Sequence, residues 1–367
     1  MISDSPILDR LSHLHLGPLV AALVLSAIGL VTVHSASAEL AIDYLPRQLV
    51  FVAIGCVLMA VVFFIDYHQL VELSPILYGF GLLLLAAVLL IGHEAGGARS
   101  WIVLGPFRLQ PSEPVKIATA LLLARYLSQI RRSHLELREI LTAASMVAVP
   151  MVLIALQRDL GSAAMYLPML AGMLLVAGIR WQQIVAAGVL GALLAAGLWS
   201  FAMKPYQRQR VQSFLSPESD PLGAGYQARQ SKIAVGSGQW AGRGYMQGTQ
   251  SQLRFLPARH TDFIMAVLAE ERGFLGVLAV LGLFGIYFTG ALSIAARSRD
   301  RTGILLVTGL VSVIAFHALY NTAMVVGLLP ITGIPLPFLS SGGSFTVVNF
   351  LATGLLLNID DRRYVNR

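Results

Sequence analysis

Charged residues are scarce in this sequence. They make up 12% of its 367 residues, well below the roughly 25% that is usual for soluble domains. Hydrophobic residues account for 56%, which excludes a soluble globular protein and predicts a membrane protein with several spans. The chain has a single cysteine, Cys56, so an intrachain disulfide is excluded and cysteine usage says nothing about the redox compartment.

Motifs of several soluble enzyme classes are also absent from the sequence. It contains no Walker sequence, no dinucleotide-binding fingerprint and no His-Glu-x-x-His motif, so these nucleotide and metal sites are not indicated. The formal net charge is +7, but most of the basic residues flank apolar runs, as is typical of membrane proteins. We therefore expect no nucleic acid partner.

Apolar runs that approach the length of a membrane helix, about 20 residues, dominate the chain. We expect the eighth run to begin early, near Asp262, and the first run to be a retained anchor, because it lacks a cleavage pattern. The fold class is therefore predicted to be an all-α polytopic membrane protein with about ten transmembrane helices in one domain, 1–367. The predicted spans are 17–35, 48–65, 75–92, 113–130, 141–156, 161–179, 183–203, 274–295, 303–327 and 344–359.

The short loops predict the orientation of these spans. Lys and Arg are more numerous on the side that holds both termini, so this side is expected to be cytoplasmic. The long polar loop, about 204–262, then lies outside the cell membrane between the seventh and eighth helices. A polar loop of this length is typical of a functional segment.

The long loop is strongly basic. Glu218, Asp220 and Asp262 are its acidic residues, and Arg208 and Arg210 of the stretch YQRQRV lie just above the bilayer. We predict that the loop covers an active site for an anionic lipid-linked substrate, and that its glycines join short helices by tight turns. The eight basic residues are Lys204, Arg208, Arg210, Arg229, Lys232, Arg243, Arg254 and Arg259.

Asp262 is the main catalytic candidate, in the stretch RHTDF at the start of an apolar helix. It could simply cap that helix. Alternatively, the helix N-terminus and nearby arginines stabilise an ionised carboxylate that is available as a general base. Glu270 and Glu271 follow on the same helix, where a membrane span carries acidic residues only for a reason. Arg272 offsets one of these charges, and the roles of both glutamates stay open.

Three other segments carry candidate substrate-binding residues. Glu113 and Lys116 share one helix face and are expected to pair, either as a structural ion pair or facing the substrate. Asp159, in the turn QRDLG, either caps the next helix or meets a basic residue of the long loop. Ser340 and Gly342 lie in PITGIPLPFLSSGGS, a broken re-entrant stretch. Their N–H groups are predicted to face an anion at the next helix start.

These motifs together resemble the SEDS family of bacterial cell-wall membrane proteins (shape, elongation, division, sporulation), in particular its RodA-type branch. The resemblance rests on GPFRLQPSE with Lys116, QRDLG, YQRQRV, GTQSQLRFLPARHTDFI, AVLAEERG and PITGIPLPFLSSGGS, between residues 95 and 344. One departure is Arg158, where the family more usually has proline. The family's essential loop carboxylate matches Asp262, its glutamate and lysine match Glu113 and Lys116, and its turn aspartate matches Asp159.

The resemblance implies a ten-span protein of the bacterial inner membrane, with both termini cytoplasmic. It also implies peptidoglycan glycosyltransferase activity on lipid II during cell elongation. The implied partners are a class B penicillin-binding protein, which supplies the transpeptidase, and other proteins of the elongation complex.

The chemistry of this reaction assigns roles to the candidate residues. Asp262 is expected to take the proton of the acceptor 4-hydroxyl, and Lys116, Arg208 and Arg210 to stabilise the departing undecaprenyl pyrophosphate. An α-linked donor and a β-linked product imply one inverting displacement. Assistance by a divalent cation, Mg²⁺ or Mn²⁺, stays open. The alternative function is a lipid II flippase, and a third is a non-catalytic scaffold, for which Asp262 is dispensable.

Overall fold

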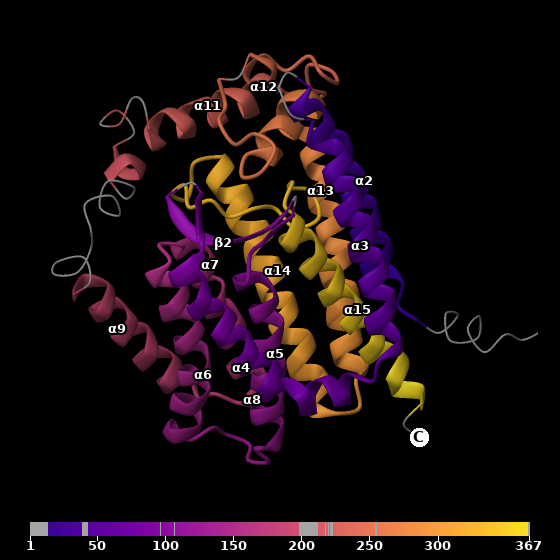
Figure 1. The fold of residues 1–367 in the computed structure, drawn as a ribbon, viewed down its shortest axis with the longest axis vertical. Helices are drawn as coiled ribbons and strands as arrows, with labels where there is room; N and C mark the ends of the chain where they lie inside the picture. Colours follow the sequence, from indigo (N-terminus) through magenta and orange to yellow (C-terminus); the bar gives the residue numbers. More distant parts are fainter. Residues whose placement is uncertain are drawn as a thin grey trace, which may run out of the picture.

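The computed structural model describes residues 14–38, 43–95, 97–105, 107–197, 212–216, 218, 220, 223–253 and 255–365. Most of them are helical, in a bundle whose helices run along the long axis of the molecule (Figure 1). The helices are α2 (Gly17–Ser37), α3 (Leu45–Phe64), α4 (Tyr67–Ile91), α5 (Ser112–Gln129), α6 (Leu137–Leu156), α7 (Leu160–Ala164), α8 (Tyr166–Ala177), α9 (Trp181–Gly197), α11 (Ala224–Ser237), α12 (Thr249–Gln252), α13 (Ile264–Arg297), α14 (Arg301–Val325) and α15 (Gly343–Val365).

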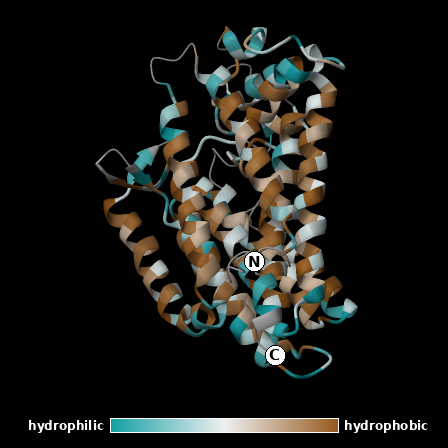
Figure 2. Ribbon diagram, turned by 90° about the vertical axis from the view of Figure 1, so that its right-hand side faces the viewer, coloured by the Kyte–Doolittle hydropathy of each residue, from teal (hydrophilic) through white to brown (hydrophobic). Residues whose placement is uncertain are grey.

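Among the described residues, eight helical segments are long and apolar enough to cross a membrane. They are α2, α3, α4, α6, α7 together with α8, α13, α14 and α15. The other two predicted spans fall on α5 and α9. The mostly helical, multi-pass class is confirmed, whereas the count of ten and the side of the long loop stay predictions. Hydrophobic residues fill the middle of the bundle and polar residues its two ends (Figure 2).

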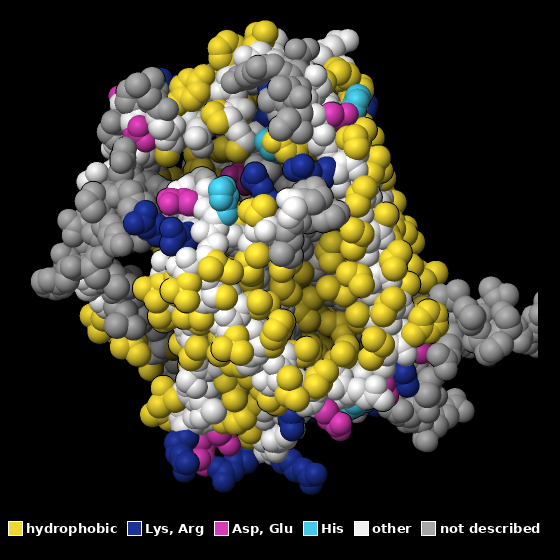
Figure 3. All heavy atoms as spheres, viewed as in Figure 1, with side chains coloured by type: hydrophobic (Ala, Val, Ile, Leu, Met, Phe, Trp, Pro, Cys, Tyr) yellow, Lys and Arg dark blue, Asp and Glu magenta, His cyan; other side chains and the backbone are white. Residues whose placement is uncertain are grey.

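The two ends of the bundle differ. α11 and α12 cover one end, and the C-terminus lies at the other (Figure 1). The start of the first described helix lies beside the C-terminal helix, because the His15 N–H donates to Asp360 Oδ2 at 2.6 Å. The space-filling view shows the same polarity, with charged side chains above and below a hydrophobic band (Figure 3).

α14 and α15 form the centre of the bundle. More than half of each span is buried, compared with about a fifth of α3, α4 and α6. Small residues bring α3 close to α15, as is common between membrane helices. A Cβ added at Gly55 would lie 2.7 Å from Phe350, and one at Gly354 would lie 2.7 Å from the Met59 carbonyl oxygen.

A small antiparallel sheet departs from the all-α prediction. Its order is β1 (His93–Ala95), β2 (Ala98–Leu104) and β3 (Phe107–Leu109). Leu104 pairs with Phe107 across a hairpin in which Gly105 has φ +60°. The sequence analysis did not predict these strands, which are only three to seven residues long.

α13 begins at Ile264, as the expected early start requires, and breaks at Gly273. Gly273 has φ +65° and ψ −164°, and a Cβ there would lie 2.4 Å from the Gly242 nitrogen. Only glycine fits this close approach without strain. The short part of α13 before Gly273 therefore lies against the long loop, and the membrane-length part follows it.

Candidate functional site

A cavity of about 760 Å³ lies at the end of the bundle that α11 covers. Its lining comes from segments far apart in the sequence: β2, the start of α5, the 158–162 turn, the start of α11, residues 258–262 and the segment 331–335. Three predicted acids, Glu113, Asp159 and Asp262, share this lining. Its volume falls within the range of about 300–1,000 Å³ that is usual for ligand pockets.

Asp262 lies on the cavity wall and is partly exposed. Its backbone carbonyl accepts a hydrogen bond of 2.7 Å from Asn321 Nδ2. The N-cap residue of α13 is Phe263, so Asp262 precedes the cap position and does not occupy it. A Cβ added at Gly333 would lie 3.6 Å from Asp262 Oδ2, so glycine at 333 leaves room beside the carboxylate.

The expected arginines near Asp262 are arranged differently. Arg259 is buried, and its guanidinium donates to the carbonyl oxygens of Ala36, at 2.6 Å, and of Ser251. Arg259 therefore fastens the loop to α2. Arg208 and Arg210 lie outside the described residues, so their contacts with pyrophosphate stay predictions.

The described lining of the cavity is acidic. It holds Glu113, Asp159, Asp220 and Asp262, and Arg158 is the one Lys or Arg among these described lining residues. Asp220 is committed to the start of α11, where it accepts from the N–H groups of Gly223 and Ala224 at 3.0 and 2.9 Å. The basic surface predicted for the substrate is therefore not found on this part of the wall.

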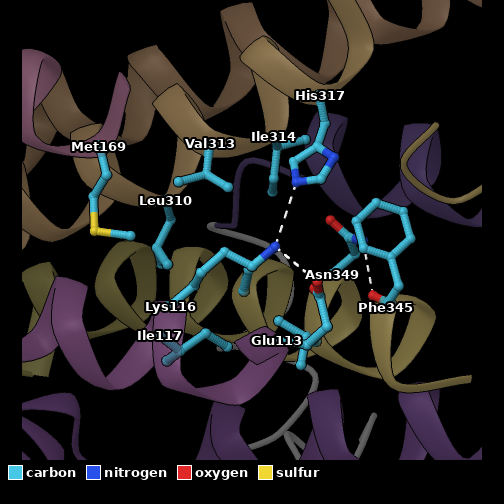
Figure 4. Close-up of a pocket in the computed structure, with 12 residues that line it drawn as sticks. Glu113, Lys116, Ile117, Met169, Leu310, Val313, Ile314, His317, Phe345 and Asn349 are labelled. Carbon is cyan, nitrogen blue, oxygen red and sulfur yellow. Dashed lines mark hydrogen bonds and ion pairs between the residues drawn. The ribbon is translucent and has the colours of Figure 1, made fainter. Parts of the chain in front are cut away.

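Glu113 and Lys116 form the expected ion pair, 2.9 Å apart and almost fully buried. The Lys116 ammonium also lies 3.4 Å from His317 Nε2 and 5.8 Å from the centre of the Phe345 ring (Figure 4). Glu113 and His317 line the large cavity, whereas Lys116 lines a separate pocket of about 20 Å³. This geometry fits a structural ion pair, because a ligand in the large cavity would meet Glu113 and His317 first.

Asp159 caps α7, as one of its two expected roles requires. Its carboxylate accepts from the Ser162 N–H at 3.0 Å, from the Ser162 hydroxyl at 2.8 Å and from Gln110 Nε2 at 3.0 Å. Within the described part of the chain, its hydrogen bonds do not extend to a basic residue of the long loop. Asp159 nevertheless lines the cavity.

The N–H groups predicted to face an anion are already engaged. Ser340 N–H donates to the Leu336 carbonyl at 3.0 Å, and Gly342 N–H donates to Gln48 Oε1 at 3.2 Å. One donor thus has its partner within the turn and the other has its partner on α3, and the anion site expected from the sequence stays a prediction. The Ser340 hydroxyl donates to the Thr261 carbonyl at 2.6 Å, so Ser340 instead supports the residue before Asp262.

Glu270 and Glu271 fasten the long loop. Glu270 is fully buried and accepts from the N–H groups of Gln250 and Ser251, at 2.8 and 3.1 Å, at the start of α12. Glu271 accepts from the Met246 N–H at 3.2 Å and from the Ser35 hydroxyl. The sequence left the roles of Glu270 and Glu271 open. In the structure both carboxylates accept hydrogen bonds from backbone N–H groups of the long loop, and Glu271 also accepts one from Ser35 of α2.

Sequence reasoning missed two polar residues of α14, His317 and Asn321. Both are buried; His317 lines the cavity, and Asn321 donates to the carbonyl of Asp262, which lines it too. The signal was available, because a histidine and an asparagine four residues apart within an apolar span are unusual. The predicted span 303–327 contains both.

Metal ligands are not gathered in the described part of the chain. No group of three or more His, Cys, Asp or Glu side chains within it is placed to hold a metal ion. The divalent cation that the sequence analysis left open therefore stays a prediction, and the reaction below is written for the side chains alone.

Comparison with known proteins gives one family. The family model for FtsW, RodA and SpoVE, described as a cell cycle protein, matches residues 16–365. The chain is 41% identical to the peptidoglycan glycosyltransferase MrdB of Escherichia coli K12, over 95% of this chain and 94% of that one. It is 34% identical to the peptidoglycan glycosyltransferase RodA of Treponema pallidum, over 94% and 97% of the two chains.

Solved structures agree with these sequence relatives. One is described as coordinating polymerization and crosslinking in a peptidoglycan synthase complex, with a TM-score of 0.83, 32% identity and coverage of 95% and 98%. Another is the rod shape determining protein RodA of Thermus thermophilus, with a TM-score of 0.71, 29% identity and coverage of 95% and 97%. The multi-pass helical fold, the motifs around the cavity and these matches agree: the chain belongs to the FtsW/RodA/SpoVE family of inner-membrane proteins, the SEDS family.

Proposed function

We propose that this chain, a peptidoglycan glycosyltransferase by its family and relatives, polymerises lipid II into glycan strands during cell elongation with Asp262 as the general base. The observation that carries the proposal is the position of Asp262 on the wall of the 760 Å³ cavity, at the end of the bundle that α11 covers. An enzyme that works on a lipid-linked sugar needs such a space where membrane and aqueous phase meet.

In the proposed reaction, the 4-hydroxyl of the acceptor sugar attacks the anomeric carbon of the donor. Asp262 takes the hydroxyl proton as the new bond forms, and the bond from the anomeric carbon to undecaprenyl pyrophosphate breaks. One displacement inverts the configuration, so one base is sufficient and no sugar is attached to the protein. Arg208 and Arg210 are the proposed partners of the leaving pyrophosphate. Lys116 acts indirectly in this proposal, by pairing with Glu113 on the cavity wall.

The proposed orientation places both termini in the cytoplasm and the cavity outside. The described ends of the chain lie at the end opposite α11, which supports a common side for both termini. The proposed partner is a class B penicillin-binding protein, with further proteins of the elongation complex. The solved peptidoglycan synthase complex that this fold resembles supports such a pairing.

The test is lipid II polymerisation by the purified protein with its class B partner. Wild type is compared with Asp262→Asn, Asp262→Ala and, as a matched control, Glu94→Gln. Glu94 is an exposed carboxylate that only approaches Arg158, at 3.9 Å. We expect glycan strands from wild type and Glu94→Gln and a loss of about 10²–10⁴-fold in rate for both Asp262 variants. Polymerisation at the wild-type rate by both folded Asp262 variants would remove the base assignment.

A lipid II flippase is the alternative function. It needs a polar path through the depth of the membrane, because a charged headgroup is costly in hydrocarbon. Below Glu113 and His317, the next pocket is about 20 Å³ and is otherwise lined mainly by apolar side chains, including Met169, Leu310 and Val313 (Figure 4). This narrowing favours the enzyme. Lipid II translocation without polymerisation, by wild type in vesicles, would reverse that preference.

A further inference from the structure

Two buried polar side chains project from one face of α14, the helix that runs from the cavity into the centre of the bundle. His317 and Asn321 are four residues apart, so they lie one helical turn from each other. Their exposed fractions are 3% and 0%. An unpaired polar side chain in a membrane span costs free energy. The hydrogen-bond partners of His317 and Asn321 therefore indicate what these side chains do.

Asn321 joins Asp262 to the segment beside it. The amide nitrogen of Asn321 lies 2.7 Å from the Asp262 carbonyl oxygen and 2.7 Å from the Ile334 carbonyl oxygen. Both partners are acceptors, so the nitrogen and not the oxygen of the amide must face them, and both of its hydrogens are donated. One rigid side chain therefore fixes the main chain at Asp262 relative to Ile334.

His317 makes a parallel connection one turn away. Its Nδ1 lies 3.2 Å from the Pro335 carbonyl oxygen, and its Nε2 lies 3.4 Å from the Lys116 ammonium. The carbonyl needs a donor and the ammonium needs an acceptor, so a neutral imidazole with its proton on Nδ1 satisfies both. His317 therefore ties the Glu113–Lys116 pair to the carbonyl next to the one that Asn321 holds.

We propose that Asn321 and His317 are positioning residues: Asn321 holds Asp262 to the Ile334 carbonyl, and His317 holds the Glu113–Lys116 pair to the neighbouring Pro335 carbonyl. Two of the four acids that line the cavity, Asp262 and Glu113, are then placed by one stretch of backbone and one face of α14. This inference rests on the proposed role of Asp262, and it adds the residues that set where that carboxylate stands. Neither residue needs to touch the substrate.

The test measures polymerisation rates against lipid II concentration, for the purified protein with its partner. Asn321→Asp keeps the shape of the side chain and removes at least one of its two donors, and Asn321→Ala removes the side chain. We expect kcat to fall about 100-fold, because small misplacements of reacting groups cost this much, while KM changes by about twofold at most. Thr322→Ala is the control, because the Thr322 hydroxyl only donates to Ala318 of its own helix, at 2.8 Å.

The His317 variants separate its two contacts. His317→Gln places an amide oxygen near the position of Nε2 and keeps the acceptor for Lys116. His317→Asn places an amide N–H near the position of Nδ1 and keeps the donor to Pro335. We expect each to retain more activity than His317→Ala, which loses both contacts. Equal activity of all three at the wild-type level contradicts the role of His317.

Folding and chemistry are separated by rates per folded protein, with the folded fraction taken from thermal unfolding and size-exclusion profiles. In the Asp262→Asn background, Asn321→Ala is expected to cause little further loss of rate, since the two act through the same carboxylate. A wild-type kcat in folded Asn321→Asp, or an equal loss in Thr322→Ala, overturns the inference. Absence of polymerisation by wild type overturns the proposed function itself.

Discussion

The turns at 158–162 and 258–263 look alike in the sequence but differ in the structure. Each has a basic residue and an aspartate just before an apolar helix. Asp159 occupies the N-cap of α7, and its carboxylate bonds Ser162 and Gln110. Asp262 lies one residue before the N-cap of α13, and its main chain is held by Asn321. We propose that position relative to the cap separates an aspartate that stabilises a helix, Asp159, from one that acts on a ligand, Asp262.

The largest expected effect is the loss of catalysis in Asp262→Asn. The amide keeps the size of the side chain but cannot accept a proton as a base, so the polymerisation rate should fall by about 10²–10⁴-fold. Because Asp262 does not occupy the cap of α13, the thermal midpoint should stay close to that of wild type. Initial rates and thermal unfolding of the same preparation measure both. A clear loss of stability in Asp262→Asn would instead indicate that Asp262, like Asp159, has a structural role.

Glu113 lines the same cavity as Asp159 and Asp262, but its carboxylate is paired with a buried lysine, Lys116. Lys116→Met leaves the Glu113 carboxylate buried without its cation, which should destabilise the protein by about 3–5 kcal/mol. The double variant Glu113→Leu with Lys116→Met removes both charges and should recover most of this stability. Thermal unfolding in detergent tests the pair. A double variant as unstable as Lys116→Met would contradict a purely paired role.

Removal of the Asp159 cap should have a smaller effect. Asp159→Ala loses the bonds to Ser162 and Gln110, and a lost N-cap costs about 1 kcal/mol. Asp159→Asn, which keeps an acceptor for the Ser162 N–H, should lose less. The thermal midpoints of the two variants give the order. If both were as stable as wild type, the cap would contribute nothing and the contrast with Asp262 would disappear.

Arg158 gives a test of the backbone in the same turn. Its φ is +66°, which is unfavourable for residues with a Cβ and impossible for proline. Arg158→Gly should therefore stabilise the protein by about 0.5–1 kcal/mol, and Arg158→Pro should destabilise it, although the family more usually has proline there. A stabilising proline would show that this turn adopts another backbone conformation.

The smallest expected effect concerns His260, two residues before Asp262. Burial, together with the positive charge of Arg259, lowers the pKa of His260, and its ring stacks on Tyr44 at 4.2 Å. The folded protein thus favours neutral His260. The stability that neutral His260 contributes is fully present above the pKa of histidine in the unfolded chain, about 6.5. It is lost as the pH falls through the lower pKa of His260 in the folded protein.

His260→Gln removes this titration, so its thermal midpoint should fall less than that of wild type between neutral and acidic pH. Thermal unfolding across that pH range measures the difference in slope. Identical slopes for the two proteins would show that His260 does not contribute to the pH dependence. Gln183→Ala, far from this turn at the start of α9, is a control that should follow wild type.

The sequence predicted the spans well because apolar runs of membrane length have few alternatives. It also predicted the Glu113–Lys116 pair, whose spacing fixes a common helix face. It did not predict the sheet at 93–109 or the break at Gly273, because both depend on contacts with other parts of the chain. For the same reason it did not predict the hydrogen-bond partners of Ser340 and Gly342, whose N–H groups donate to Leu336 and Gln48.

The candidate site was predicted residue by residue but not as a geometry. The sequence singled out Asp262, Glu113 and Asp159, and the structure places all three on one cavity. It could not distinguish a capping aspartate from one that precedes the cap, because both have the same neighbours along the chain. It also overlooked Asn321, although an asparagine four residues after a histidine in an apolar span is an unusual signal.

The most direct measurement is lipid II polymerisation by Asp262→Asn beside Asp159→Asn, each with its thermal midpoint and with wild type as reference. We predict that Asp262→Asn loses polymerisation and keeps its stability, whereas Asp159→Asn loses some stability and keeps more of its rate. Polymerisation at the wild-type rate by folded Asp262→Asn would contradict the assignment of Asp262 as the general base.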